Sequence, residues 1–589
     1  MTFYHNSRDT GCRAPFGAVR QGTKITIRAK SPSPVTLRLW TDDGEKLIKM
    51  KRRKDSWWEA HITPKKTGLL WYYFISDGKI YCAPQDLLGG ESVLHEDGER
   101  LDSHQITVYA ADFAPPDWLR DSVMYQIFPD RFFDGCNGEL LKERSDIVVH
   151  SDKTEMPFAV PDPDENNPEL ILTNDFYGGN LPGIEQKLSY IKGMGFSSIY
   201  LNPIFEANSN HKYDTSDYSR VDPTFGDNQL FTRLCEKAAE SGIKIILDGV
   251  FSHTGSDSVY FNKTGKYGEG GAFQDINSPY CSWYNFTYHP HGYESWWGFK
   301  SLPNVNEMEP KYIDFIARGK NAIVKKWLRL GASGWRLDVA DELPDEFIEI
   351  LRKNVKKENP QAAVIGEVWE DATNKVSYDK LRTYALGYGL DSVMNYPLRD
   401  ALIAFFLGTE DSAMLKRRLD SQMENYPKEM YYSLMNLIGS HDRSRIINIL
   451  GECDDQSLSR ADQREVRMSD EQYDTGKRRL KAMAKIIFAL PGMPCVYYGD
   501  EVGLQGMRDP FCRAFYPWGG EDKSLRSFFK KLIHQRNSSP ALRTGFVDIS
   551  APKPDVIEIR RYFANDVDAF GTPQQQDNVI IRIDRRRLK

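Results

Sequence analysis

Four short segments each place a carboxylate beside another charged or polar side chain. They read Asp248-Gly-Val-Phe-Ser-His253, Gly334-Trp-Arg-Leu-Asp338, Gly366-Glu-Val-Trp369 and Gly439-Ser-His-Asp442. Each ends or follows a short apolar run that is typical of a β-strand. Carboxyl groups gathered in one pocket can cleave a sugar linkage, one as the nucleophile and another as the proton donor. We therefore expect the four segments to meet in one site.

The segment around Asp338 pairs this carboxylate with an arginine. Arg336 and Asp338 are two residues apart on a predicted strand, so both side chains face the same side. A nearby guanidinium favours the ionised form of a carboxylate, which is the form that a nucleophile requires. The alternative is a purely structural ion pair at the end of a strand, which is a common arrangement.

Glu367 follows Val-Ile-Gly and precedes Val368 and Trp369. Apolar neighbours raise the pKa of a carboxyl group, so Glu367 is expected to keep a proton and to act as a general acid. The alternative is a glutamate on a solvated loop at the start of a helix.

The other two segments pair an imidazole with a carboxylate, Asp248 with His253 and His441 with Asp442. Such pairs can form hydrogen bonds with sugar hydroxyl groups, or they can be ordinary polar residues at strand ends. A zinc site is a third possibility, disfavoured because no further histidine stands at ligand spacing.

Strand and helix patterns alternate from about residue 118 to 540, which predicts a (β/α)₈ TIM barrel, where side chains at the strand ends converge. Because the span exceeds that of a typical barrel, insertions are expected after strand one (134–182) and strand three (254–308). The predicted strands are 123–129, 197–202, 244–251, 334–339, 363–369, 390–395, 431–438 and 494–498. The predicted helices are 183–193, 229–241, 310–330, 344–357, 398–407, 415–424 and 477–490.

Two β-rich regions flank the predicted barrel. Residues 1–113 contain short alternating runs separated by turns, which predicts an N-terminal β-sandwich. The catalytic domain is expected at 114–540, with the inserted subdomain 254–308. Residues 541–589 are expected to form a small C-terminal β-domain.

Composition excludes several classes of function. The 589 residues carry a net charge of −6, which argues against nucleic acid or an anionic membrane as the main partner. The sequence begins without a signal region and has no apolar run long enough to cross a membrane. Its eight cysteines are scattered, so we expect reduced thiols and a cytoplasmic location.

The four segments, on predicted strands three, four, five and seven, resemble the conserved segments of the alpha-amylase family, glycoside hydrolase family 13. The resemblance covers about residues 118–540. It implies that Asp338 is the nucleophile, Glu367 the acid/base and Asp442 a third carboxylate that binds and distorts the sugar. It also implies substrate-binding or orienting roles for Tyr213, Asp214, Asp248, His253, Arg336 and His441.

Further motifs resemble one branch of the family. Leu302-Pro-Asn-Val-Asn306, Tyr293-Glu-Ser-Trp-Trp-Gly298 and the extra N-terminal β-domain are similar to neopullulanases, cyclomaltodextrinases and amylopullulanases. This implies hydrolysis of α-1,4 and possibly α-1,6 bonds in maltodextrins, cyclodextrins or pullulan. Trp297 is a candidate sugar platform. A transglycosylase on the same α-glucans is the alternative, and a homodimer is possible.

The resemblance also indicates a possible calcium-binding loop. The segment Asp134-Gly-Cys136-Asn-Gly138, followed by Gly178-Gly-Asn180, resembles a calcium-binding loop of these relatives. Asp134, Asn137 and Asn180 are the candidate ligands, but Cys136 replaces one oxygen ligand and Asn180 removes one charge. No cofactor is expected to be required, and structural calcium is possible.

Overall fold

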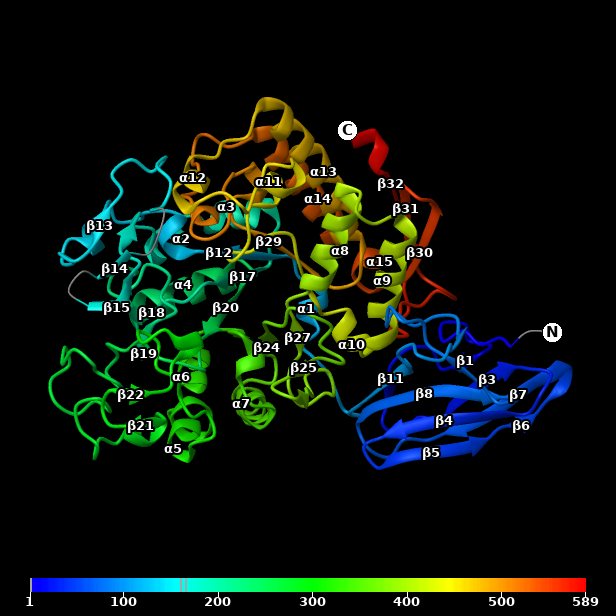
Figure 1. Ribbon diagram of the computed structural model, residues 1–589. Helices are drawn as coiled ribbons and strands as arrows, with labels where there is room; N and C mark the ends of the chain where they lie inside the picture. Colours follow the sequence, from blue (N-terminus) through cyan, green and yellow to red (C-terminus); the bar gives the residue numbers. More distant parts are fainter. Residues whose placement is uncertain (1–2, 159–161, 165–166, 589) are drawn as a thin grey trace.

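The computed structural model describes residues 3–158, 162–164 and 167–588. Figure 1 shows a central barrel with an N-terminal β-lobe (blue) on one side and a segment carrying β21 and β22 (green) on the other. A small C-terminal sheet (red) lies against the barrel helices. The architecture therefore confirms the predicted TIM barrel with β-rich parts at both ends.

Eight parallel strands form the barrel in the order β27-β24-β23-β20-β17-β12-β29-β28. The ring closes through a single parallel bridge between Met394 and Met435. The strands are short and almost entirely buried, as expected for a parallel sheet that helices cover. They are β12 (Met124–Ile127), β17 (Ser198–Leu201), β20 (Lys244–Gly249), β23 (Gly334–Leu337), β24 (Ala363–Gly366), β27 (Ser392–Val393), β28 (Met435–Leu437) and β29 (Met493–Tyr497).

Amphipathic helices cover the outside of the barrel. In α7, for example, the buried residues Phe347, Ile348, Leu351 and Val355 recur at helical spacing, so one stripe packs inward. The larger helices are α2 (Leu181–Gln186), α3 (Leu188–Met194), α4 (Asn228–Glu240), α6 (Ile323–Arg329), α7 (Asp345–Glu358), α8 (Tyr396–Leu407), α9 (Ser412–Asn425), α13 (Asp470–Ala489) and α14 (Lys523–Ser538).

Several helical regions differ from the sequence prediction. The helix expected at 310–330 is broken into α5 (Pro310–Ile313), a π-helical turn and α6, because the chain leaves the helix at Gly319. There the side chain of Lys325 donates to the carbonyl oxygens of Arg318 and Gly319. The expected strand 431–438 starts later, since α10 (Lys428–Tyr431) occupies its first position. Helix α14 was not predicted.

The N-terminal part is a sandwich of two sheets. Ile25 and Ile27 of one sheet pack with Leu37 and Tyr72 of the other in a separate hydrophobic core. One sheet contains β1 (Arg13–Ala14), β3 (Ile25–Lys30), β7 (Trp57–Ile62) and β6 (Lys51–Arg52). The other contains β10 (Val93–Leu94), β9 (Lys79–Cys82), β8 (Gly68–Ser76), β11 (His104–Tyr109), β2 (Val19–Arg20), β4 (Val35–Thr41) and β5 (Gly44–Lys49).

The inserted segment after β20 has its own aromatic cluster, in which Phe261 contacts Tyr284 and Tyr293. Its hairpin consists of β21 (Phe286–Tyr288) and β22 (Gly292–Tyr293). The C-terminal sheet contains β30 (Phe546–Lys553), β31 (Val556–Tyr562) and β32 (Asn578–Asp584), and its buried residues join the core of the barrel. Smaller hairpins pair β14 (Asp162–Asp164) with β15 (Asn167–Leu172), β18 (Phe205–Ala207) with β19 (Thr215–Val221), and β25 (Val376–Ser377) with β26 (Lys380–Leu381).

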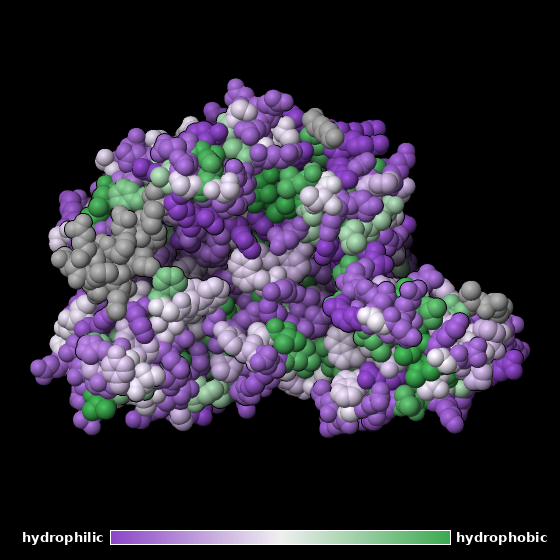
Figure 2. All heavy atoms as spheres, viewed as in Figure 1, coloured by the Kyte–Doolittle hydropathy of each residue, from purple (hydrophilic) through white to green (hydrophobic). Residues whose placement is uncertain are grey.

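The surface in Figure 2 is largely hydrophilic, with a hollow near its centre that hydrophilic and intermediate residues line. Within the described part of the chain, no helix is both long and apolar enough to span a bilayer.

Candidate active site

Arg336 is the centre of the site. It lies on β23, and its Nη1 donates to Asp248 Oδ1 and Asp338 Oδ1, both at 2.8 Å, while its Nη2 donates to Glu367 Oε2 at 2.6 Å. Asp248 ends β20, and Asp338 and Glu367 directly follow β23 and β24. Because neighbouring parallel strands end at the same rim, one guanidinium can hold all three carboxyl groups.

Asp338 and Glu367 line one cavity of about 810 Å³. Burial raises the pKa of Asp338 well above its ordinary value, and the neighbouring Glu367 and Asp248 raise it further, whereas Arg336 lowers it. One guanidinium therefore does not offset the burial of Asp338 and the charge of its carboxyl neighbours. The expectation that Arg336 suffices to keep Asp338 ionised is not met, because burial and the neighbouring carboxyl groups outweigh the guanidinium.

The contacts of Glu367 also differ from those expected. Its Oε2 accepts hydrogen bonds from Arg336 and from the backbone N–H of Val339 at 2.8 Å, and its Oε1 accepts one from Trp369 Nε1 at 3.0 Å. The sequence suggested apolar neighbours, but the fold surrounds Glu367 with donors. In contrast, Asp338 Oδ2 has no hydrogen-bond partner among the described residues, which leaves this oxygen available for attack.

A chain of hydrogen bonds lies beneath the cavity. Gln126 Nε2 donates to His441 Nδ1 at 3.0 Å, so the proton of this imidazole is on Nε2. His441 Nε2 lies 2.6 Å from the Tyr213 hydroxyl, which donates to Asp248 Oδ2 at 3.0 Å, and Tyr200 donates to the same oxygen at 2.6 Å. Burial lowers the pKa of His441 well below its ordinary value, so the ring is neutral.

The predicted binding residues therefore fall into two groups. Tyr213, His253 and His441 line the cavity, whereas Asp248 and Arg336 lie behind its wall. Asp248 and Arg336 consequently position Asp338 and Glu367 rather than contacting a sugar.

His253 has both ring nitrogens engaged by protein groups. Its Nε2 lies 3.1 Å from the carbonyl oxygen of Tyr213, and its Nδ1 lies 3.0 Å from the hydroxyl of Ser252. Burial lowers its pKa to about 4, so the ring is neutral at pH 7, with one donor and one acceptor. In this arrangement neither nitrogen is left for the expected bond to a sugar.

Asp442 lies on the cavity wall beside two basic groups. Its Oδ1 lies 3.2 Å from His441 Nε2 and 3.6 Å from Arg513 Nη2. Burial and the nearby Glu367 raise the pKa of Asp442 to about 7, although 29% of its side chain is exposed. The protonated and ionised forms of Asp442 are therefore both populated near neutral pH.

The rim of the cavity carries the remaining predicted residues. Trp297 is 76% exposed, and its Nε1 donates to Glu342 Oε1 at 3.1 Å, which joins the inserted segment to the loop after β23. Asp214 also lines the cavity, but the backbone N–H and the hydroxyl of Ser209 hold its carboxylate. An exposed indole at the mouth of the cavity is suited to contact a sugar ring.

Sequence reasoning missed four residues of the site. Gln126, Tyr200 and Asn202 lie on or directly after β12 and β17, and Asn202 Nδ2 donates to the Tyr213 hydroxyl at 3.1 Å. Their signal was available, because polar side chains near the ends of predicted barrel strands face the pocket. Arg513 lies in a short 3₁₀ helix (Phe511–Arg513) after β29, and no sequence pattern of this kind indicates it.

The side chains of the candidate calcium loop are hydrogen-bonded to one another and to the backbone. Asn180 Oδ1 accepts hydrogen bonds from the N–H groups of Gly135 (3.1 Å) and Gly183 (2.8 Å), while its Nδ2 donates to Asp134 Oδ1 (3.1 Å). Two N–H donors on one amide atom identify that atom as the oxygen, so the NH₂ group faces Asp134. Asn137 belongs to the same loop, with a positive φ of 55°. Among the described residues, no group of three or more His, Cys, Asp or Glu could hold a metal.

Comparisons with known proteins find similar sequences and structures over most of the chain. The model of the alpha-amylase catalytic domain matches residues 126–547. An amylopullulanase of Thermoanaerobacter thermohydrosulfuricus is 37% identical over 99% of this chain, which spans only 42% of the relative's length. A cyclomaltodextrinase of a Bacillus species is 30% identical over 83% of this chain and 78% of its own length. A solved cyclomaltodextrinase structure has a TM-score of 0.64 and 27% identity, covering 98% of this chain and 90% of its own.

Proposed function

The chain belongs to the alpha-amylase family, and from this premise we propose that it is a retaining glycoside hydrolase of α-glucans. The observation that carries the proposal is the pair of carboxyl groups, Asp338 and Glu367, held by one guanidinium on the wall of one cavity. In retaining enzymes the two carboxyl groups stand about 5–5.5 Å apart, close enough for one to attack the sugar directly.

The reaction proceeds in two steps on these residues. Asp338 Oδ2 attacks the anomeric carbon as Glu367 gives its proton to the glycosidic oxygen, and the bond between that carbon and oxygen breaks. Water then gives a proton to Glu367 while its oxygen displaces Asp338, so the two inversions restore the original configuration. The proposed mechanism requires the negative charge on Asp338 and the proton on Glu367 when the sugar is bound.

We propose α-1,4 bonds as the main target and α-1,6 bonds as a second. The names of the relatives support both, because amylopullulanase and cyclomaltodextrinase appear among them. The cavity of about 810 Å³ supports binding of several sugar units. Maltodextrins, cyclodextrins and pullulan are thus the candidate substrates.

The decisive experiment replaces the nucleophile. Asp338→Asn should abolish release of reducing sugar from maltotriose, while Asp400→Asn, on a side chain that is 57% exposed, should not. Circular dichroism checks that both variants fold. Substantial turnover by folded Asp338→Asn would refute the assignment.

The product profile then separates the linkages. Panose released from pullulan marks α-1,4 cleavage, maltotriose marks α-1,6 cleavage, and ring opening of β-cyclodextrin marks the cyclodextrinase type. Products longer than the substrate would instead indicate transglycosylation. Proton NMR of the fresh product reports whether the anomeric configuration is retained.

We also propose a cytoplasmic setting, which eight free cysteines support, since reduced thiols persist there. No cofactor is proposed for the chemistry, because the carboxyl groups supply the nucleophile and the proton. The homodimer remains a prediction.

A further inference from the structure

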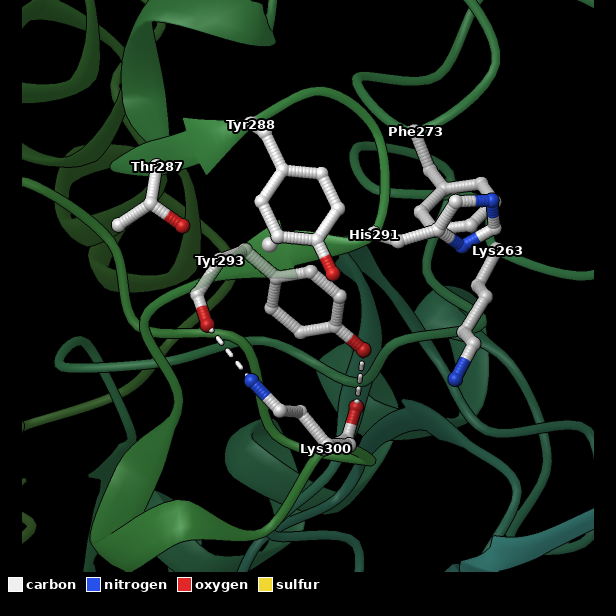
Figure 3. A pocket seen from close by; sticks show the side chains of 8 residues that line it. Lys263, Phe273, Thr287, Tyr288, His291, Tyr293 and Lys300 are labelled. Atoms are coloured by element: carbon white, nitrogen blue, oxygen red, sulfur yellow. Dashed lines mark hydrogen bonds between the residues drawn. The ribbon is translucent and has the colours of Figure 1, made fainter.

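A second cavity lies in the inserted segment, on residues that the proposed reaction does not use. It has a volume of about 410 Å³, and it is lined mainly by aromatic and hydrogen-bonding side chains from β21, β22 and the adjacent loops. Figure 3 shows the rings of Tyr288 and Tyr293 one beyond the other, with Phe273 and His291 beside them and the amines of Lys263 and Lys300 below.

Tyr288 is an exposed but well-positioned ring. It is 66% exposed, which is unusual for a large aromatic residue on a strand. It pairs with Gly292 across the hairpin, and a Cβ atom on Gly292 would lie 2.4 Å from Tyr288 Cδ1. The glycine therefore leaves room for the ring to lie over the backbone. A tyrosine side chain has only two rotatable bonds, so it loses little conformational entropy when a ligand binds.

Lys300 places a hydrogen-bond donor at the same cavity. Its Nζ donates to the carbonyl oxygen of Tyr293 at 2.9 Å, and the Tyr293 hydroxyl donates to the carbonyl oxygen of Lys300 at 2.8 Å. These two bonds fix the lysine, yet use one of the three N–H donors of its ammonium group. Thr287 and His291 add exposed polar groups to the wall.

This combination fits a sugar chain. Sugars place C–H groups on aromatic faces, whose negative charge density attracts them, and use hydroxyl groups for hydrogen bonds. No carboxylate is among the described residues that line the cavity.

The second cavity also adjoins the first. Lys300 lines the second cavity, while Phe299, Ser301 and Leu302 on either side of it in the chain line the catalytic one. A second link is Lys263, whose backbone N–H donates to the carbonyl oxygen of Ser256, another residue of the catalytic cavity. The segment 299–302 therefore contributes lining residues to both cavities.

We propose that this cavity is a second binding site for polymeric α-glucans, with Tyr288 as its platform. The proposal rests on the proposed function for the identity of the ligand. The inserted segment would then bind long substrates at a second site, in addition to lining the catalytic cavity.

The test separates binding from catalysis. In an Asp338→Asn background, which prevents turnover, Tyr288→Ala should raise the Kd for pullulan in native affinity gels by about three- to tenfold. Tyr288→Phe should bind like the parent, because it keeps the ring. The control Tyr388→Ala removes a tyrosine that is 45% exposed and lines neither cavity, and it should have no effect.

With Asp338 intact, Tyr288→Ala should raise the KM for pullulan by a similar factor and leave the kcat/KM for maltotriose within twofold. Unchanged pullulan binding in Tyr288→Ala, or equal losses in Tyr288→Ala and Tyr388→Ala, would overturn the proposal. Failure of the proposed function has a different signature, since the protein with Asp338 intact would then release no sugar from maltotriose, while the gels still report binding.

Discussion

At the scale of single residues, the site depends on how many charges one guanidinium can hold. Arg336 contacts Asp248, Asp338 and Glu367 through two nitrogens, and all four side chains are buried. The motif predicted the contact between Arg336 and Asp338. It did not predict that burial would outweigh the arginine in setting the pKa of Asp338, because burial belongs to the fold and not to the spacing of residues.

Arg336→Lys tests this geometry. A lysine has a single ammonium nitrogen and cannot hold three carboxyl groups in the same fork, so the two reacting groups should shift. We expect kcat/KM for maltotriose to fall by at least about 100-fold. Arg329→Lys, in an exposed pair with Glu358, is the matched control. Activity near that of the parent would show that the fork is not needed.

Asp442 gives stability a defined pH dependence. Because its pKa of about 7 in the folded protein exceeds the ordinary value of 3.8, the folded state binds this proton more tightly than the unfolded chain does. The resulting stabilisation is fully present below about pH 4 and is lost as the pH rises through about 7. Asp442→Asn should therefore stabilise the protein at pH 8, by on the order of 1–3 kcal/mol, and much less at pH 5.

Thermal unfolding at the two pH values measures this difference. The exposed Asp400→Asn should show no such dependence. A larger gain for Asp442→Asn at pH 5 than at pH 8 would contradict the assigned direction of the pKa shift.

At the scale of elements, side-chain hydrogen bonds join the two barrel strands that share only one backbone bridge. Strands β27 and β28 meet through one bridge, and Asn395 reinforces it. Its Nδ2 donates to Asn436 Oδ1 at 2.9 Å, and its Oδ1 accepts from the N–H of Leu398 at the start of α8 and from Gln422. The sequence located both strands, but it gave no sign that the Asn395 side chain contributes to the last seam of the barrel, together with Ser392, whose hydroxyl donates to the carbonyl oxygen of Ser433 at 2.6 Å.

Asn395→Ala should weaken this seam. The change removes the N-cap of α8 and leaves buried amide groups without partners, so we expect a loss of about 2–4 kcal/mol in the free energy of unfolding. Urea denaturation measures the loss. Asp227→Ala removes the N-cap of α4 at an exposed position and should lose only about 1 kcal/mol. Equal losses in the two variants would argue against a special role for Asn395.

The loop after β12 makes a prediction about calcium. Since the Asn180 amide bridges Asp134 and two backbone N–H groups, chelation by EDTA should leave the thermal midpoint of the parent unchanged. Asn180→Asp would replace the donor with a carboxylate facing Asp134, so this variant should be less stable and should regain stability with Ca²⁺. A lower thermal midpoint of the parent in EDTA would contradict the prediction that its stability is independent of calcium.

At the scale of the whole molecule, buried ion pairs fix the N-terminal sandwich to the barrel. Glu424 of α9 accepts hydrogen bonds from Arg8 Nε at 3.0 Å and Arg13 Nη2 at 2.8 Å. The sandwich contributes no residue to the lining of the catalytic cavity in the described part of the chain. Its contact with the barrel is therefore structural within one chain.

Glu424→Leu should loosen this contact. The substitution leaves the buried guanidinium of Arg13 without its carboxylate, which costs about 3–5 kcal/mol. Calorimetry should show the sandwich unfolding at a lower temperature, while Glu45→Leu, which removes an exposed partner of Arg38, should change stability by less than about 1 kcal/mol. Equal changes in stability in the two variants would contradict the conclusion that Glu424 stabilises the contact between the sandwich and the barrel.

The sequence by itself determined the barrel, the order of its strands and the carboxylates at their ends, because strand periodicity and short motifs are local properties. The tertiary structure alone decided which groups share Arg336, why His253 has no free nitrogen, how Asn180 faces Asp134, and where a second cavity opens beside Tyr288. Most of these features depend on burial and on contacts between residues far apart in the chain, such as Arg336 with Glu367 and Asn180 with Asp134, which short sequence motifs do not specify.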